Sequence, residues 1–282
     1  MTRCAKRKLA ARALAMAVAA GALLPWGVPW GGSPSRAAEG GAVDLELLLA
    51  VDTSSSVSAE EFDLQMRGLS EAFRHPAVLA AIEAVGDLGI AVALIQWSDA
   101  RNQFVAIDWT EVRDEASATA LADEIDSSPR FLIGGGTAIG GALEFALRQF
   151  ELSPFAGLRK VIDLSGDGRT NQGADPAEQR DLAVERGVTI NGLAILNEDV
   201  YVDRYYRVNV IGGTGAFVMT AADYEAFADA ILQKLVKEIA GVPVAAAPPD
   251  LPPAGSPAGP EADPAGSGAA QLGAAGAPPA GF

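Results

Sequence analysis

Apolar runs of strand length alternate with helical patterns between residues 42 and 240, and this alternation limits the possible folds more than any other feature. The runs are almost continuously apolar, which is typical of strands that are buried on both faces. They are LELLLAV (45–51), GIAVALIQWS (89–98), RKVIDLSG (159–166) and VTINGLAIL (188–196). AFVMTA (216–221) predicts one further short strand.

Helical segments separate these strands. Ser58 and Glu61 have the spacing of a capping box, while Asp175, Pro176 and Gly187 are typical of the start and end of a helix. The predicted helices cover residues 58–74, 76–86, 118–128, 137–152, 175–187 and 222–241. This order predicts an α/β fold in which a doubly wound, mostly parallel central sheet carries helices on both faces.

One strand is expected to run against the others. QFVAIDWTEV (103–112) follows the strand at 89–98 after the short connection DARN, so the two are predicted to form an antiparallel hairpin at the edge of the sheet. Asp99 begins this connection, and it is either an ordinary hairpin residue or a neighbour of a ligand site. Ligands of such sheets bind outside the carboxyl ends of the strands.

The N-terminal residues 1–37 are typical of a secretory signal peptide. They combine a basic start, an apolar segment at Leu14–Leu24, and small residues at Ser35 and Ala37. An uncleaved membrane anchor is the alternative, although this segment is short for a bilayer span. The only cysteine, Cys4, would be removed by cleavage. We therefore expect a periplasmic or secreted protein.

The C-terminal residues 241–282 are rich in alanine, proline and glycine. Such a segment has too few large apolar side chains to offset the entropy of ordering it, so we expect a disordered tail. The chain is then predicted to contain one folded domain, residues 42–240.

The charge of the chain limits its partners. The net charge is −15, and cleavage after residue 37 would leave 15 basic against 36 acidic residues, about −21. This balance argues against nucleic acid and anionic membranes as partners. Solubility alone would also account for most of it. We expect a monomer with no stable membrane anchor after cleavage.

Polar side chains follow the first strand where it ends. Asp52 closes the strand, and Ser54 and Ser56 lie two and four residues later, so in an extended segment the three side chains project the same way. Taken alone, DTSSS is also a common start for a helix.

Two further loops are expected at the same edge of the sheet. GGGTAIGGAL (134–143) places Thr137 at a helix start, and DLSGDGRTN (163–171) places Asp167 beyond a central strand. Carboxylate and hydroxyl oxygens are hard donors, which suit Mg²⁺, Mn²⁺ or Ca²⁺ better than a soft metal.

These three motifs, in this order, resemble the metal-ion-dependent adhesion site (MIDAS) of the von Willebrand factor type A domain. That family has the alternating architecture predicted above, and the resemblance covers nearly all of residues 42–240. The chain also resembles a bacterial group of exported proteins with this domain, the DUF1194-like proteins.

The resemblance implies roles for five residues. It assigns the metal to Asp52, Ser54, Ser56, Thr137 and Asp167, with the serines and the threonine coordinating directly and the aspartates often acting through water. It also implies an open coordination position for an Asp or Glu of a partner protein. The chain is then expected to be a metal-dependent binding module and not an enzyme, and its net charge would make association with an acidic partner slow and salt-sensitive.

Two other functions remain open on the sequence alone. A metal-assisted hydrolase of phosphate or sulfate esters would need a nucleophile or base beside the metal, where the sequence offers only carboxylates. A scaffold with a purely structural metal is the third possibility.

Other motifs support these functions less well. DLSGDGRTNQGA (163–174) has Ala174 where a calcium loop requires glutamate, and the glycine-rich segment 134–141 lacks the lysine of a P-loop. The only histidine, His75, is expected to cap a helix or lie on the surface and not to serve a hydrolase. Trp97 and Trp109 are expected to pack in the core.

A second glycine-rich segment, IGGTGAF (211–217), has two interpretations. It follows three tyrosines, Tyr201, Tyr205 and Tyr206. Its glycines are either structural turns, or the aromatic side chains before them form an exposed rim that binds a partner.

Overall fold

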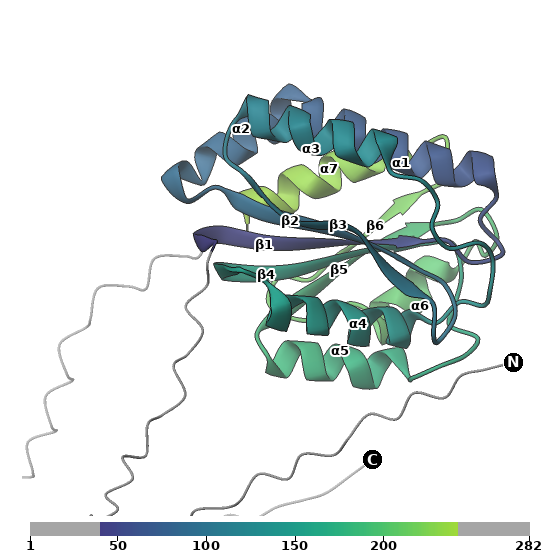
Figure 1. The fold of residues 1–282 in the computed structure, drawn as a ribbon. Coiled ribbons are helices and arrows are strands. Elements are labelled where there is room, and N and C mark those ends of the chain that lie inside the picture. Colours follow the sequence, from purple (N-terminus) through teal and green to yellow (C-terminus); the bar gives the residue numbers. More distant parts are fainter. Residues whose placement is uncertain (1–39, 242–282) are drawn as a thin grey trace, which may run out of the picture. The chain divides into compact units, whose positions relative to one another are not determined.

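Figure 1 shows the computed structural model of the protein, which describes residues 40–241. The predictions for residues 1–37 and for the tail after residue 241 lie outside the described residues. Within 40–241, no helix combines the length and apolar character needed to cross a membrane.

A six-stranded sheet forms the centre of the domain, in the order β3-β2-β1-β4-β5-β6. Neighbouring strands are parallel except β2 and β3, which form the predicted antiparallel hairpin at one edge. The strands are β1 (Gly41–Asp52), β2 (Ile90–Trp97), β3 (Gln103–Val112), β4 (Phe155–Gly166), β5 (Val188–Ile195) and β6 (Val218–Ala221).

The helices cover both faces of this sheet. They are α1 (Ala59–Arg74), α2 (Pro76–Ala84), α3 (Glu115–Ser127), α4 (Ile139–Leu152), α5 (Pro176–Glu185), α6 (Val202–Asn209) and α7 (Phe227–Ala240), with a 3₁₀ turn, η1, at Gly86–Leu88. Figure 1 shows α1, α2, α3 and α7 on one face and α4, α5 and α6 on the other. The predicted fold class is therefore confirmed.

Two hydrophobic cores lie on the two faces of β1. Leu47 and Leu49 belong to the core under α1 and α7, whereas Leu48 and Ala50 belong to the core under α4 and α6. This alternation follows from the two-residue period of a strand and explains why β1 reads as one unbroken apolar run. Asp52 follows Leu48 and Ala50 at the same two-residue spacing, so its side chain lies on the face of the sheet that α4 and α6 cover.

The order of the strands determines where a ligand site is expected. The chain leaves β1 toward β2 and β3, then crosses back to place β4, β5 and β6 on the other side of β1. The carboxyl ends of β1 and β4 therefore flank the topological switch point, where open α/β sheets hold their ligands.

Helix α6 is the main departure from the predicted elements, because the sequence analysis predicts no helix there. It is short, and only Val202 and Tyr206 of it are buried. The other differences concern the ends of elements: β1 begins at Gly41 and not at 45, and β4 begins at Phe155 and not at 159. Helix α3 begins at Glu115 because Asp114 caps it, and α7 begins at Phe227 and not at 222.

A buried ionic cluster joins α7 to β4. The Lys234 Nζ lies 2.6 Å from Asp163 Oδ1 and 2.6 Å from Glu238 Oε1, and all three side chains are buried. Burial, and then the charge of Asp163, raises the pKa of Glu238 to about 8. Glu238 therefore holds a proton at neutral pH, which leaves one cation facing one carboxylate.

Replacement of the buried lysine tests this charge balance. Lys234→Met is expected to lower the free energy of unfolding by about 3–5 kcal/mol at pH 7, because Asp163 is left as a buried charge without its cation. Glu238→Gln is the matched control, and it should change stability by no more than about 1 kcal/mol because a neutral amide replaces a protonated carboxyl. Urea denaturation measures both values.

The same control variant has an expected pH dependence. The folded state holds the Glu238 proton up to about pH 8, whereas the unfolded state releases it near the ordinary value of 4.5. The contribution of Glu238 to stability is therefore present at low pH and lost as the pH rises through 8. Wild-type stability measured relative to Glu238→Gln should fall across this window, and a flat difference would contradict the raised pKa.

Candidate metal centre at the carboxyl ends of β1 and β4

The turn after β1 is held in place by its own backbone and by β2. Asp52 Oδ1 accepts a hydrogen bond of 2.7 Å from the backbone N–H of Ser54. Thr53 donates to the carbonyl of Trp97 twice, from its backbone N–H at 2.8 Å and from its hydroxyl at 2.9 Å. Gln65 of α1 donates to the Asp52 carbonyl at 3.3 Å. The DTSSS turn is therefore anchored to a central strand and to a helix.

Hydrogen bonds connect three of the predicted site residues across 111 positions of sequence. The hydroxyls of Ser54 and Ser56 lie 3.1 Å apart, and the Ser56 hydroxyl donates to Asp167 Oδ1 at 2.8 Å. Asp52 adjoins the same turn through its bond to Ser54. The predicted meeting of the β1 and β4 loops is thus seen directly.

Thr137 approaches the centre from a third loop. Its side chain is buried, and its Oγ1 lies 3.7 Å from the point that a Cβ on Gly168 would occupy, beside Asp167. The backbone N–H of Thr137 donates to the Asn171 side chain at 2.9 Å, and the N–H of Asn171 donates to the Thr137 carbonyl at 2.9 Å. The two loops therefore hold each other in place.

The helix start predicted at Thr137 needs a correction. Helix α4 begins at Ile139, and its capping position is Ala138, which makes no side-chain cap hydrogen bond. The Thr137 hydroxyl is therefore not used as a helix cap.

Burial dominates the electrostatics of the two aspartates, and the charge of Asp167 adds to it at Asp52. Asp52 is fully buried, and its Oδ2 has no hydrogen-bond partner. Burial first, and then the charge of Asp167, raises the pKa of Asp52 to about 7, and burial also raises the pKa of Asp167. A divalent cation would offset both effects. The donor atoms are hydroxyl and carboxylate oxygens, so the residues fit a hard cation such as Mg²⁺.

The carboxylates in this centre are few, and hydroxyls make up the rest of the donor set. Within residues 40–241, no group of three or more His, Cys, Asp or Glu side chains is placed to hold a metal. A cation here would depend on serine and threonine oxygens beside Asp52 and Asp167.

Three residues that the sequence analysis did not assign to the centre support it. Arg130 donates to the backbone carbonyls of Thr53 at 2.8 Å and Ser54 at 3.2 Å, and its charge opposes the rise in the pKa of Asp52. The Tyr224 hydroxyl donates to Asp167 Oδ2 at 3.1 Å. These contacts are tertiary, and nothing in the local sequence indicates them.

Tyr206 of α6 is the third of these residues. Its hydroxyl is buried without a hydrogen-bond partner. The point that a Cβ on Gly166 would occupy lies 2.8 Å from this hydroxyl and 2.8 Å from Asp52 Oδ2. Gly166 therefore leaves the space in which the two polar atoms face each other. The sequence signal for a buried Tyr206 is its helical spacing from Val202, and this signal can be used only once α6 has been recognised as a helix.

The remaining candidates have structural roles. His75 caps α2, since its Nδ1 accepts from the backbone N–H of Ala77 at 3.1 Å. It lies at the far end of α1 from the DTSSS turn, about 24 Å along the helix axis. Asp99 accepts from Arg101 N–H at 2.9 Å and from the Asn102 side chain at 2.8 Å, as expected for a hairpin residue.

The tryptophans and the tyrosines divide between core and surface. Trp97 is fully buried, and Trp109 stacks near Phe150 with ring centroids 5.3 Å apart, which confirms their packing roles. Tyr201 is 54% exposed, while Tyr206 is buried. The predicted aromatic rim is thus only partly exposed, and it belongs to a helix.

Comparison with known families identifies the chain. The family model described as "Protein of unknown function (DUF1194)" matches residues 42–243, more than two thirds of the chain. The chain is a member of the DUF1194 family. This membership confirms the family resemblance predicted from the sequence. None of the curated proteins compared with the chain is a significant match.

Solved structures share the fold of this DUF1194 protein. Proximal thread matrix protein 1 (PTMP1) from the mussel byssus matches with a TM-score of 0.54 and 17% identity, over 70% of this chain and 48% of that one. A second structure of PTMP1, with a zinc-occupied MIDAS motif, matches with a TM-score of 0.52, 16% identity and the same coverage. The pilus adhesin SpaC from Lactobacillus rhamnosus GG matches with a TM-score of 0.52 and 14% identity, over 70% of this chain and 31% of that one.

These likenesses concern the fold. The DUF1194 chain spans about half the length of PTMP1 and less of SpaC, and identities of 14–17% show a shared architecture alone. The mostly parallel sheet with one antiparallel edge strand is the architecture predicted from the resemblance to von Willebrand factor type A domains, and that prediction is confirmed.

Two neighbouring serines provide a matched test of the centre. Ser56→Ala is expected to weaken Mg²⁺ or Mn²⁺ binding by about 10- to 100-fold, because it removes a hydroxyl that is a candidate ligand and that donates a hydrogen bond to Asp167. Ser55 is exposed, and Ser55→Ala should leave binding unchanged. Isothermal titration measures both, with Asp52→Asn/Asp167→Asn as the variant that loses binding. Equal affinities for the two serine variants would contradict the assignment.

The buried aspartate should lower the stability of the metal-free protein. In EDTA at pH 8, Asp52→Asn is expected to raise the free energy of unfolding by about 1–3 kcal/mol, because it removes a buried charge next to Asp167. The pKa of Asp52 is raised, so the wild type loses stability as the pH rises from about 4 to about 7. The gain should therefore shrink at pH 5. A variant less stable than wild type at pH 8 would contradict this account.

Proposed function

We propose that this DUF1194 protein is an exported, metal-dependent binding module that captures an acidic residue of a partner protein. A divalent cation, Mg²⁺ or alternatively Mn²⁺ or Ca²⁺, would be held by Asp52, Ser54, Ser56, Thr137 and Asp167. The observation that carries the proposal is the hydrogen-bonded set of serine hydroxyls and Asp167 at the switch point, beside the unpartnered oxygen of Asp52.

The proposed residues are of two kinds, carboxylates that supply negative charge and hydroxyls that supply neutral oxygens. Asp52 and Asp167 supply two negative charges, which would leave a divalent centre near neutral and able to attract one more carboxylate. Ser54, Ser56 and Thr137 supply neutral oxygens that fill positions without adding charge. When bound, the cation supplies an electrophilic position for a partner's carboxylate oxygen.

The surrounding contacts support a preorganised centre. Tyr224 and Ser56 each donate to one oxygen of Asp167, so this carboxylate has a fixed orientation. Arg130 holds two carbonyls of the turn after β1. Recognition in such a centre consists of coordination, and the proposal includes no bond-breaking chemistry.

The comparisons add support of a different kind. PTMP1 is a thread matrix protein whose MIDAS motif holds zinc in one structure, and SpaC is a pilus adhesin. Both work outside the cell as their names describe them, which agrees with an exported role for this chain. The metal and the partner proposed for this chain rest on the residues of its own centre and not on these two proteins.

The hydrolase alternative has less structural support. His75 lies about 24 Å along α1 from the DTSSS turn, so it does not provide a base at the centre. Such an enzyme would have to use Asp52 or Asp167, which the proposal assigns to the cation.

A ternary complex with a carboxylate peptide tests the proposal directly. The protein is loaded with Mn²⁺ and titrated with acetyl-Gly-Asp-Gly-amide, while the relaxation of water protons is measured. The aspartate peptide is expected to lower the relaxation by displacing water from the metal, and acetyl-Gly-Asn-Gly-amide is expected to leave it unchanged. The same measurement on Asp52→Asn is the control, because any effect that remains in this variant comes from Mn²⁺ bound elsewhere on the protein.

Two results would overturn the proposed function. One is an equal response to the aspartate and asparagine peptides. The other is metal-dependent turnover of p-nitrophenyl phosphate or p-nitrophenyl sulfate that disappears in Asp52→Asn, which would establish the hydrolase instead.

A further inference from the structure

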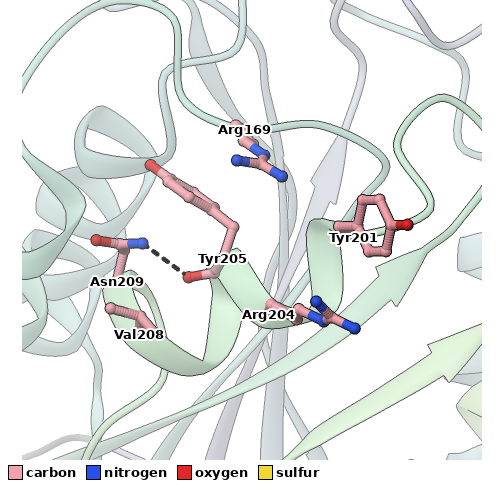
Figure 2. Close-up of a pocket in the computed structure, with 6 residues that line it drawn as sticks. All are labelled: Arg169, Tyr201, Arg204, Tyr205, Val208 and Asn209. Carbon is pink, nitrogen blue, oxygen red and sulfur yellow. Dashed lines mark hydrogen bonds between the residues drawn. The ribbon is translucent and has the colours of Figure 1, made fainter.

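A pocket of about 430 Å³ lies between α6 and the loop that follows β4. Figure 2 shows the side chains around it, with Tyr205 and Arg169 at one end and Tyr201 and Arg204 at the other. Its lining residues are Arg169, Tyr201, Arg204, Tyr205, Val208 and Asn209. Two cations and two aromatic rings thus surround a hollow of side-chain size.

Each arginine of the pocket lies near a tyrosine ring. The Arg169 guanidinium carbon is 5.7 Å from the centroid of the Tyr205 ring, and that of Arg204 is 4.8 Å from the Tyr201 ring. These contacts restrict the arginines without satisfying their N–H donors. The pocket therefore presents oriented donors, as recognition of a carboxylate requires.

The two arginines differ in their internal partners. Arg169 Nε pairs with Asp199 Oδ2 at 2.6 Å, and Asp199 Oδ1 also accepts from the backbone N–H of Tyr201 at 2.9 Å. Asp203 lies 3.7 Å from Arg207, outside the pocket. Among residues 40–241, no carboxylate forms an ion pair with Arg204. Arg204 is therefore the cation of the pocket that is open to an external anion.

The pocket adjoins the candidate metal centre through two elements. Arg169 follows Asp167 by two residues, which limits the distance between their Cα atoms to about 7 Å. Helix α6 contributes Tyr205 to the pocket, while the next residue, Tyr206, reaches the point beside Gly166 where it faces Asp52. A short peptide segment could therefore span from the metal to the pocket.

We propose that this pocket binds a second carboxylate of an acidic segment whose first carboxylate lies at the metal. The inference deepens the proposed function and rests on it. Arg204 would receive the carboxylate, and the two tyrosine rings with Val208 would contact the methylene groups of its side chain. The occupant is thus a partner segment with two Asp or Glu residues.

Charge complementarity supports this occupant. The chain carries a net charge of −15, so most of its surface repels an acidic partner at long range. Arg204, close to the proposed metal centre, would give such a partner one favourable place to dock. The pocket would therefore set the orientation of the partner and select segments with a second acidic residue.

The test compares peptides with one and with two carboxylates. Acetyl-Gly-Asp-Gly-amide is the single-carboxylate probe, and a series with Asp and Glu separated by increasing numbers of glycines is the two-carboxylate probe. Affinities are measured by titration calorimetry in Mg²⁺, and amide shifts of α6 are followed by NMR in Mg²⁺ and in EDTA. The variants are Arg204→Gln and, as a matched control on the same helix, Arg207→Gln.

The second carboxylate is expected to increase affinity by about 1.4- to fivefold at the best spacing, which is the range for an exposed ion pair. Arg204→Gln should remove this gain and leave the single-carboxylate affinity unchanged, while Arg207→Gln should preserve both. The amides of Tyr201, Arg204 and Tyr205 should shift with the two-carboxylate peptide even in EDTA, at higher peptide concentration.

The outcomes separate the two proposals. If no spacing improves affinity and the α6 amides do not shift, the pocket proposal is overturned, whether or not the single carboxylate binds through the metal. If the α6 amides shift and Arg204→Gln abolishes the shift, but binding does not depend on metal, the pocket binds a carboxylate by itself, and the proposed function fails together with the two-site proposal that rests on it.

Discussion

The burial of two carboxylates at the switch point of the sheet is the constraint that the contacts around them answer. Asp52 and Asp167 lie at the ends of β1 and β4, where burial disfavours the charged form of both and the charge of Asp167 further opposes ionisation of Asp52. Arg130, Tyr224 and the serine hydroxyls reduce this cost without removing it. The buried cluster on α7 offers a useful contrast, because there Lys234 supplies a permanent internal cation. Within residues 40–241, no lysine pairs with Asp52 or Asp167 in this way, and the proposed cation would supply the missing positive charge.

The frame around the centre is assembled before any cation arrives. Ser55 donates to the Gly135 carbonyl at 3.0 Å, and Ala138 donates to the Ser98 carbonyl at 2.8 Å, so the loops after β1 and β2 are bonded to the segment that leads into α4. Asn171 joins this segment to the loop after β4. These contacts lie at the ends of buried strands. Binding of a cation would then require only small changes in side-chain position, and little binding free energy would be lost in ordering the loops.

The sequence predicts where the loops of the centre meet, because β1 ends on Asp52 and parallel topology brings Asp167 to the same edge. The predicted extended segment after Asp52 is wrong, since Ser54 and Ser56 lie in a turn in which the Val57 N–H donates to the Ser54 carbonyl at 3.1 Å. Helix α6 could not be predicted in this way, since only two of its side chains are buried. The roles of Arg130, Tyr206 and Tyr224 depend on contacts between segments far apart in sequence. Local patterns carry no information about such contacts.

Gly166 has a consequence for how this family can diverge. Any side chain there would collide with both Asp52 Oδ2 and the Tyr206 hydroxyl. A lineage that keeps both the buried aspartate and the tyrosine is therefore expected to keep glycine at position 166. A lineage that has lost either side chain can accept a larger residue there. A relative in which Gly166 has been replaced should also have lost its aspartate at position 52 or its tyrosine at position 206. A replaced Gly166 is therefore a marker of descendants that no longer keep Asp52 and Tyr206 together at the end of β4.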